Sequence, residues 1–274
     1  MRIFDEDWVS LRFGEGLFFW LGAGAIIRQM VDIHCHLLPN VDDGPRSWDV
    51  CLQMCEMAQA DGIEHIVATP HANEAFRYDR EAMSKMLEAL SQRVVGKLQL
   101  SLGCDFHLSY DNLVEVLKNP SQYTISGTNY LLVELSDFSI PPSVSQSLHR
   151  LLAAGIVPII THPERNMVLR SDPQRVLEWV EDGCLVQITA NSLTGQWGTQ
   201  ARRTAEWLMT HAAAHFLATD AHGVRLRPPI LSEGLVAAEK ILGKPAARVL
   251  VYDNPRAVIC GQCVPKIPFS ATQL

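Results

Sequence analysis

"DIHCHLLPNVDDG", residues Asp32–Gly44, is the most informative stretch of this 274-residue chain. Two histidines, His34 and His36, stand one residue apart at the end of a short apolar run, and two aspartates precede Gly44. Alternate residues of a β-strand point to the same side, so these two imidazoles can reach one ion. The stretch therefore suggests a metal site at the end of a strand.

Outward from this stretch, short apolar runs alternate with helical stretches along the chain. We predict helices over 47–60, with Ser47 as N-cap, and over 81–95, and helical runs before the last three strands. Strands that are apolar throughout and alternate with helices indicate a parallel sheet, either open and doubly wound or closed into a barrel. The predicted strands are 31–34, 65–69, 98–103, 130–135, 157–161, 185–189 and 215–219.

The composition indicates one globular domain. Hydrophobic residues make up 47% of the chain, which has no Gly/Ser linker and no internal repeat. A net charge of −7 argues against a broad contact with nucleic acid. The seven cysteines are odd in number and irregularly spaced, which favours a reducing, cytoplasmic location over a disulfide framework. We interpret the pair Cys260 and Cys263 as two small, semi-buried side chains rather than a redox or zinc site.

The first 29 residues differ from the sequence that follows. Their apolar run, Gly16–Ile27, is shorter than the roughly 20 residues of a membrane span, and acidic residues precede it, unlike a signal peptide. We therefore expect no integral membrane span. Residues 1–29 are interpreted as an N-terminal extension, either loosely packed or upstream of a start at Met30. Residues 30–262 then form the domain and 263–274 a C-terminal tail.

Six of the seven predicted strands end in a histidine or a carboxylate. Because sites in α/β sheets and barrels lie at the carboxyl ends of the strands, we expect these side chains to converge. A single histidine is more often a core or surface residue than a ligand, but a core has no need of charged groups at so many strand ends. The candidate ligands are His34, His36, Asp43, His71, Asp105, Glu134, His162, Asp220 and His222.

Nine candidate ligands are too many for one ion, so two or three divalent ions are expected. A mixture of imidazoles and carboxylates suits Mn²⁺, Fe or Zn²⁺. Clustered ions of this kind suit the hydrolysis of phosphate esters, because one ion activates water while its neighbour offsets charge on the phosphoryl oxygens. The sequence therefore points to a phosphoesterase.

Two arginines follow candidate ligands closely along the chain. Arg165 comes shortly after His162, and Arg227 shortly after His222. A guanidinium group binds phosphate through two parallel hydrogen bonds, so we predict that both arginines bind the substrate phosphate. The alternative for each is a surface salt bridge, which is the interpretation that we favour for Arg225 in the same loop.

These motifs together resemble a known family. The segments "DIHCHLLPNVDDGP", "ATPH", "GCDFHL", "LLVELS", "THPERN", "TDAH", "RPP" and "DNPRAV" occur in order between Val31 and about Gly261. They resemble the metal-dependent protein tyrosine phosphatases of bacterial capsule and exopolysaccharide operons, within the PHP (polymerase and histidinol phosphatase) superfamily. The resemblance implies a distorted (β/α)₇ barrel, a three-metal centre that usually prefers Mn²⁺, and dephosphorylation of the tyrosine-rich tail of a bacterial tyrosine kinase.

The resemblance also implies how the ligands divide among the ions, with Asp105 bridging two of them. Asp105 stands where family members carry glutamate, and this shorter side chain puts the bridging geometry and metal preference in question. Asp42 is expected in the loop beside the site rather than on an ion, and His107 is a weaker candidate for touching the substrate. The implied sets are His34, His36, Asp105 and Asp220 for one ion, Asp105, Glu134 and His162 for a second, and Asp43, His71 and His222 for a third.

Two alternatives to a tyrosine phosphatase remain open from the sequence. One is another PHP phosphoesterase, such as a histidinol phosphatase, which would share the metals and differ in the loops that select the leaving group. The other is a non-catalytic regulator that binds a kinase tail. The presence of all nine candidate ligands and both arginines argues against the regulator, because docking does not need them. The sequence does not indicate the oligomeric state.

Overall fold

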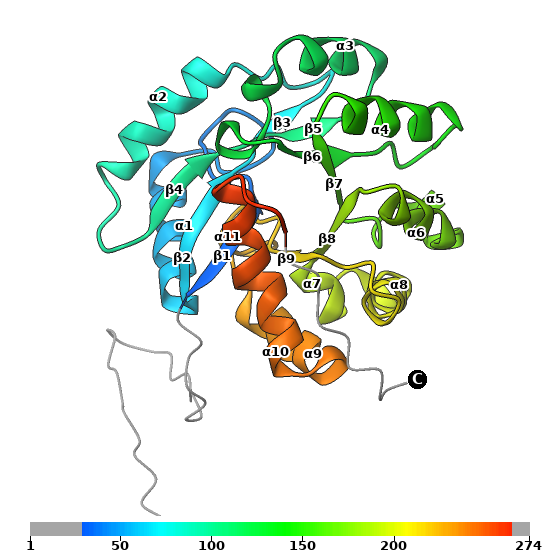
Figure 1. The fold of residues 1–274 in the computed structure, drawn as a ribbon. Helices are drawn as coiled ribbons and strands as arrows, with labels where there is room; N and C mark the ends of the chain where they lie inside the picture. The colour runs from blue at the N-terminus through cyan, green and yellow to red at the C-terminus, as the bar shows by residue number, and fades with distance from the viewer. Residues whose placement is uncertain (1–28, 265–274) are drawn as a thin grey trace, which may run out of the picture.

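The computed structural model describes residues 29–264 of the chain (Figure 1). The run Gly16–Ile27 and residues 265–274 lie outside the described residues, so the predictions about the extension and most of the tail stay predictions. All pairings between the strands are parallel, as predicted. The strands are β1 (Met30–Cys35), β2 (Ile63–Ala68), β3 (His71–Ala72), β4 (Gln99–Leu102), β5 (Asp105–His107), β6 (Tyr130–Glu134), β7 (Val157–Thr161), β8 (Leu185–Thr189) and β9 (Phe216–Ala218).

Helices connect these strands and surround them on the outside (Figure 1). Short 3₁₀ turns, η1 (Pro120–Gln122) and η2 (Ile125–Gly127), precede β6, and a π-helical turn, η3 (Val249–Asp253), leads into the last helix. The α-helices are α1 (Trp48–Asp61), α2 (Arg80–Ser91), α3 (Tyr110–Lys118), α4 (Ser143–Ala153), α5 (Met167–Ser171), α6 (Gln174–Glu181), α7 (Ala190–Leu193), α8 (Gly198–Thr210), α9 (Ser232–Leu242), α10 (Lys244–Arg248) and α11 (Asn254–Ile259).

The strands form two sheets, ordered β1-β2-β4 and β3-β5-β6-β7-β8-β9. The strand predicted over 65–69 corresponds to β2 alone, and the short β3 beyond Pro70, which has no N–H to donate, was not predicted. The predicted third strand likewise ends at Leu102, and the short β5 follows it. These two short strands pair with each other and make His71 and Asp105 direct neighbours.

The first and last strands are joined by backbone hydrogen bonds at their carboxyl ends. The Asp220 amide donates to the His34 carbonyl and the His36 amide to the Ala221 carbonyl, each at 2.8 Å. Asp32 strengthens this junction, since its carboxylate accepts a 3.0 Å hydrogen bond from the Thr219 amide. The stretch quoted first therefore lies against the segment that follows β9.

Both faces of the sheets are buried, which explains why the strands are apolar throughout. One large cluster of buried side chains lies between the strands and helices α1 to α10. A second cluster joins Ile33 of β1, Leu132 of β6 and Phe216 of β9 to Val258 of α11. Burying a side chain of this size contributes about 1.5–3 kcal/mol, so α11 belongs to the stable core of the fold.

The local predictions hold for most elements and fail in two places. Ser47 caps α1 by accepting a hydrogen bond from the Val50 amide, as predicted. The helix predicted over 81–95 ends at Ser91, because Val95 faces solvent and Gly96 adopts a left-handed φ of 114°. Cys260 and Cys263 are exposed rather than semi-buried, because both lie beyond the C-terminal end of α11, whose last buried residue is Val258.

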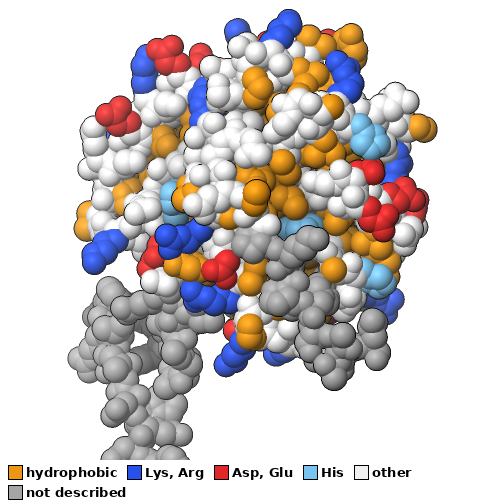
Figure 2. All heavy atoms as spheres, viewed as in Figure 1, with side chains coloured by type: hydrophobic (Ala, Val, Ile, Leu, Met, Phe, Trp, Pro, Cys, Tyr) orange, Lys and Arg blue, Asp and Glu red, His pale blue; other side chains and the backbone are white. Residues whose placement is uncertain are grey.

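The cysteines, the helices and one face of the surface complete the description of the fold. All seven cysteines are free thiols. Within residues 29–264, no helix has the length and apolar character needed to cross a bilayer. Figure 2 shows one face of the molecule, on which Lys and Arg side chains are scattered rather than gathered into one basic patch.

Candidate metal centre

The nine predicted ligands all come together at the carboxyl ends of the strands. Each belongs to at least one group of side chains whose ligand atoms lie within 4.8 Å of one another. The groups share members, so they form one continuous cluster rather than separate sites. The four groups are His36–Asp43–His71–His222, His34–His36–Asp105, His34–His162–Asp220 and His71–Asp105–Glu134.

His34 and His36 form the centre of the cluster. Their Nε2 atoms lie 3.3 Å apart, so β1 presents both imidazoles to one point, as the spacing predicted. The Oδ1 atom of Asp220 lies 3.3 Å from the Nε2 of His34 and 3.5 Å from that of His36. The Oδ2 atom of Asp105 lies 3.5 Å from His34 Nε2. Two imidazoles and two carboxylates thus surround one position.

The far nitrogen of each of these rings is held by a buried polar side chain. His34 Nδ1 lies 3.0 Å from the Oε1 of Gln187, and His36 Nδ1 lies 2.7 Å from the Oδ2 of Asp42. A hydrogen bond at Nδ1 leaves Nε2 unprotonated and fixes the plane of the ring, which is the usual arrangement around metal-ligating histidines. Asp42 also accepts from the amides of Gly44 and His71, so it orients the loop as well as the ring.

Asp43, His71 and His222 form the outer part of the cluster. The Oδ1 atom of Asp43 lies 3.4 Å from the Nε2 of His71 and 3.3 Å from the Nε2 of His222. The side chain of Asp43 is 48% exposed, whereas that of Asp105 is 1% exposed. The cluster therefore extends from a buried floor to the solvent.

Asp105 is the residue whose environment most clearly calls for a cation. Within residues 29–264, neither of its carboxylate oxygens has a hydrogen-bond partner, although both are buried. Burial raises the pKa of this carboxyl, but the nearby His34 and His71 outweigh burial and hold the pKa well below its usual range. A buried, ionised carboxylate without hydrogen bonds is costly unless it binds a cation. Aspartate at this position is long enough to face both histidines.

Glu134 and His162 complete the buried side of the cluster. Glu134 Oε1 lies 3.8 Å from His162 Nε2, and Glu134 Oε2 lies 3.7 Å from both His71 Nδ1 and His107 Nδ1. His107 is 29% exposed, so it lies at the mouth of the site. His162 and Asp220 have positive φ angles of 35° and 50°, conformations that non-glycine residues adopt mainly at functional sites.

The groups differ from the sets that the resemblance implies. His162 groups with His34 and Asp220 rather than with Asp105, and His71 groups with Asp105 and Glu134 as well as with Asp43. His36 also joins the group of Asp43, His71 and His222. The donor set, buried imidazoles and carboxylates with an orphaned Asp105, fits several divalent ions held in one cluster.

The cluster is strongly charged in the metal-free protein. Burial lowers the pKa of His36, but its hydrogen bonds to the carboxylates of Asp220 and Asp42 outweigh burial and raise it to about 9. Burial also lowers the pKa of His71, but the nearby carboxylates of Asp105 and Asp43 outweigh burial and raise it to about 11. Metal ions would therefore replace protons when they bind here.

Both predicted phosphate-binding arginines face the cluster. Arg165 and Arg227 each donate to the same oxygen, Asp220 Oδ2, and Arg227 Nε also donates to the Asp220 carbonyl at 3.1 Å. The guanidinium carbons of Arg165 and Arg227 lie 3.9 Å and 5.5 Å from the centroid of the Trp197 ring. The two cations therefore contact the same carboxylate oxygen and the same aromatic ring.

Three supporting residues were missed by the sequence analysis. Gln187 stands alone as a polar residue inside the apolar strand "LVQIT", which is a usable signal for a buried hydrogen-bonding role. Glu164 of "HPER" is fully buried and accepts hydrogen bonds from Thr189 N at 2.9 Å and Ser192 Oγ at 2.7 Å, which fixes the loop that carries Arg165. Trp197 gave no signal, because nothing in the sequence places it near the arginines.

Comparisons of this sequence with protein families and with individual proteins agree with one another. Residues 30–260 match a family described as capsular polysaccharide synthesis, CpsB/CapC. The chain is 36% identical over 208 residues to the putative tyrosine-protein phosphatase CapC of Staphylococcus aureus, covering 74% of this chain and 81% of that protein. It is 30% identical over 243 residues to the tyrosine-protein phosphatase YwqE of Bacillus subtilis, covering 87% of this chain and 95% of YwqE.

A solved structure shares the fold over most of the chain. It belongs to a crystallographic study of YwqE from Bacillus subtilis and CpsB from Streptococcus pneumoniae, described as metal-dependent tyrosine phosphatases. The superposition has a TM-score of 0.82 at 30% sequence identity and covers 89% of this chain and all of the other. The order and packing of the elements described above are therefore those of this group of phosphatases.

Proposed function

Because the chain belongs to the CpsB/CapC family of capsular polysaccharide synthesis, we propose that it is a metal-dependent protein tyrosine phosphatase that hydrolyses phosphotyrosine. The observation that carries this proposal is the continuous cluster of nine ligands with two arginines directed at its edge. The reaction class is phosphoric monoester hydrolysis. The relatives named above are tyrosine phosphatases, which favours this activity over a histidinol phosphatase or a non-catalytic regulator of a kinase.

We assign the nine ligands to a centre of two or three divalent ions, with Mn²⁺ as the expected metal. Asp105 is proposed to bridge two ions, and its buried, unpartnered oxygens support this role. Divalent ions in such a cluster supply Lewis-acid chemistry, lowering the pKa of water and offsetting negative charge on phosphoryl oxygens. Gln187 and Asp42 hold His34 and His36 with Nε2 directed at the centre, so the chain fixes the position of the ions before they bind.

Arg165 and Arg227 are proposed to bind the outer oxygens of the substrate phosphate. Both guanidinium groups now donate to one carboxylate oxygen, which is the kind of acceptor that a phosphate also presents. The phosphate would take the place of this contact with Asp220 and leave its carboxylate to the ions. Trp197 packs against both guanidinium groups, and Glu164 anchors the loop that carries Arg165.

The remaining features of the proposal concern the fold and the setting. We propose that the strands close into a distorted (β/α)₇ barrel, supported by the hydrogen bonds that join β1 to the end of β9. The domain is assigned to residues 30–262, with a cytoplasmic location that suits seven free thiols. The proposed partner is the phosphotyrosine tail of a bacterial tyrosine kinase that regulates capsule or exopolysaccharide synthesis.

Two substitutions test the catalytic assignment. His71→Ala and Arg165→Ala should each lower kcat/KM for a phosphotyrosine peptide by at least about 100-fold, because each removes a group that meets the ions or the phosphate. Circular dichroism should show an unchanged fold. His149→Ala is the matched control, since His149 is an exposed histidine that pairs with Asp182 away from the cluster. Unchanged turnover in both site variants would remove the assignment.

A further inference from the structure

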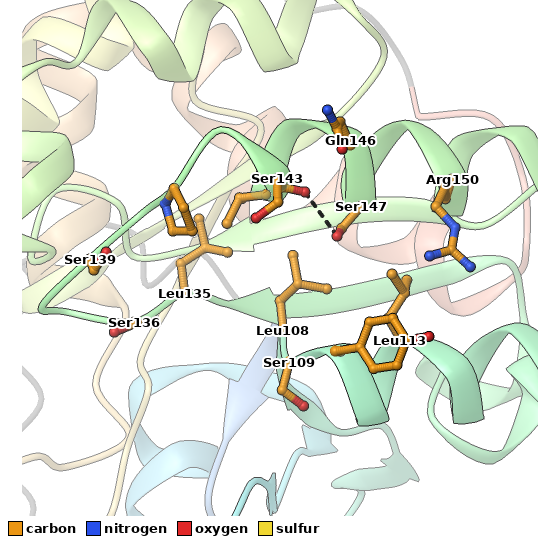
Figure 3. Close-up of a pocket in the computed structure, with 13 residues that line it drawn as sticks. Leu108, Ser109, Leu113, Leu135, Ser136, Ser139, Ser143, Gln146, Ser147 and Arg150 are labelled. Carbon is orange, nitrogen blue, oxygen red and sulfur yellow. Dashed lines mark hydrogen bonds between the residues drawn. The ribbon is translucent and has the colours of Figure 1, made fainter.

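A pocket lies between α3 and α4, on the segments that follow the carboxyl ends of β5 and β6 (Figure 3). It has a volume of about 420 Å³. Its wall begins with Leu108 and Leu135, which follow His107 and Glu134 in the chain by one residue. The segments that carry His107 and Glu134 therefore lead directly into the wall of this pocket.

The lining of the pocket combines three kinds of chemistry. Leu108, Leu113 and Leu135 provide an apolar floor, and a series of serines on α4 and the loop before it provides hydroxyl groups. Figure 3 shows Arg150 of α4 at the end of the pocket away from Ser136. Within residues 29–264 Arg150 forms no ion pair, whereas the adjacent His149 pairs with Asp182. The pocket thus offers an apolar surface and one uncompensated positive charge.

Exposed hydrophobic side chains gather around the same end of the fold. Of the large hydrophobic side chains that face solvent among the described residues, four lie on segments that follow β5, β6, β7 and β9 at their carboxyl ends. These four are Tyr110 (75% exposed), Phe138 (89%), Met167 (57%) and Leu226 (89%). Of these four, Tyr110 lines the pocket and Phe138 lies in the chain between the lining residues Ser136 and Ser139, so these two form the apolar rim of the pocket.

We propose that this pocket and its apolar rim bind the residues that flank the phosphotyrosine of a peptide substrate. The inference rests on the proposed function and deepens it, since it names the recognised segment. The occupant is an extended, flexible peptide with an apolar side chain on the leucine floor and an acidic side chain at Arg150. The charge of Arg150 selects the acidic residue, and the apolar rim selects a peptide over a small, fully polar phosphate ester.

Comparing two substrates isolates this surface from the catalytic centre. p-Nitrophenyl phosphate reaches the ions and the arginines but is too small to extend along the pocket. A phosphotyrosine peptide with leucine and glutamate beside the phosphotyrosine reaches both. Arg150→Ala and Phe138→Ser should each raise KM for the peptide about three- to tenfold, with kcat and the kinetics on p-nitrophenyl phosphate unchanged within about twofold.

Two control variants match these changes at the opposite end of the strands. Arg256 lines a pocket with Val31 and Gln99, near the amino ends of β1 and β4, so Arg256→Ala removes the same charge far from the metal centre. Val95 is 88% exposed in the connection before β4, so Val95→Ser matches Phe138→Ser. Both controls should leave KM unchanged for both substrates.

The outcomes separate failure of this inference from failure of the proposed function. If the wild-type protein with Mn²⁺ hydrolyses neither substrate, the proposed function fails and the inference falls with it. If it hydrolyses both and the pocket variants keep the wild-type KM for the peptide, only the inference is overturned. An equal loss on both substrates also overturns it, since the residues would then serve the catalytic centre. Light scattering adds one check: a change in molecular mass for Phe138→Ser would assign the rim to self-association instead.

Discussion

The guanidinium carbon of Arg165 lies 3.9 Å from the centroid of the Trp197 ring, while its Nη1 donates to the carboxylate of Asp220. Trp197 stands between Gly195 and Gly198, which have φ angles of 89° and 85°. Only glycine adopts such angles without strain, so the loop between α7 and α8 is shaped to present this one ring. Trp197 therefore limits the directions in which Arg165 can reach for a phosphate.

Replacing Trp197 tests this positioning role. Trp197→Leu should lower kcat/KM for p-nitrophenyl phosphate about tenfold, because a cation–π contact in a partly buried site is worth ~1–2 kcal/mol. Trp197→Phe keeps an aromatic face and should retain most of the activity. A loss that is equal in the two variants, or absent from both, would contradict the role of the aromatic face.

Asp105 provides a direct test of the bridging ligand. Asp105→Asn preserves size but removes the charge that two ions are proposed to share. We expect the bound metal to fall by at least one ion per chain, and kcat to fall by at least about 100-fold. Metal analysis by mass spectrometry and steady-state kinetics measure both quantities. Full metal content in Asp105→Asn would show that the carboxylate is not a ligand.

Metal removal should lower stability as well as activity. Asp105 and Asp220 are buried carboxylates that lie 3.5 Å and 3.3 Å from the same atom, His34 Nε2, so their negative charges are close together. An ion that binds only the folded state stabilises it, so adding Mn²⁺ to chelator-treated protein should raise Tm by several degrees. Calorimetry with and without Mn²⁺ measures this shift. A chelated protein that keeps its Tm and its activity would contradict the metal hypothesis.

We expect His215 to lower the stability of the folded protein in acid, independently of the metal centre. It precedes β9 at the amino end of the strand, where its Nδ1 accepts a 3.2 Å hydrogen bond from the Val186 amide. Burial lowers the pKa of His215 to about 4, below the value of about 6.5 expected in the unfolded chain. The unfolded state therefore binds more protons between these values, and stability falls as the pH drops from about 6.5 toward 4.

The size of this effect follows from the shift in the pKa. The contribution of His215 is at most about 3 kcal/mol, since one pKa unit corresponds to ~1.4 kcal/mol. His215→Asn can accept the same hydrogen bond without titrating, so its free energy of unfolding should depend less on pH over this range. Chemical denaturation of both proteins at several pH values measures the difference. Identical pH profiles would refute the assignment.

The sequence predicted the parallel strands and the convergence of the ligands because both follow from local patterns. An apolar run such as 157–161 needs no tertiary information, and the structure has β7 over the same residues. His34 and His36 were placed together by the two-residue period of a strand. Ligands at successive strand ends then share one end of the fold because all strands are parallel.

Features that depend on contacts between distant segments could not be predicted in this way. Gln187 reaches His34 from a strand more than 150 residues away, and no local pattern links the two. The short β3 beyond Pro70 was not predicted, and only the pairing of His71 with Asp105 shows that it is a strand. Trp197 meets Arg165 through a loop whose path is set by the packing of α7 and α8.

The most direct test of the central claim is a side-by-side assay of three substrates with Mn²⁺: a phosphotyrosine peptide, a phosphoserine peptide of the same sequence, and histidinol phosphate. We predict that kcat/KM is highest for the phosphotyrosine peptide, and that a chelator abolishes its hydrolysis. A clear preference for histidinol phosphate, or turnover of the phosphotyrosine peptide that survives the chelator, would contradict the account.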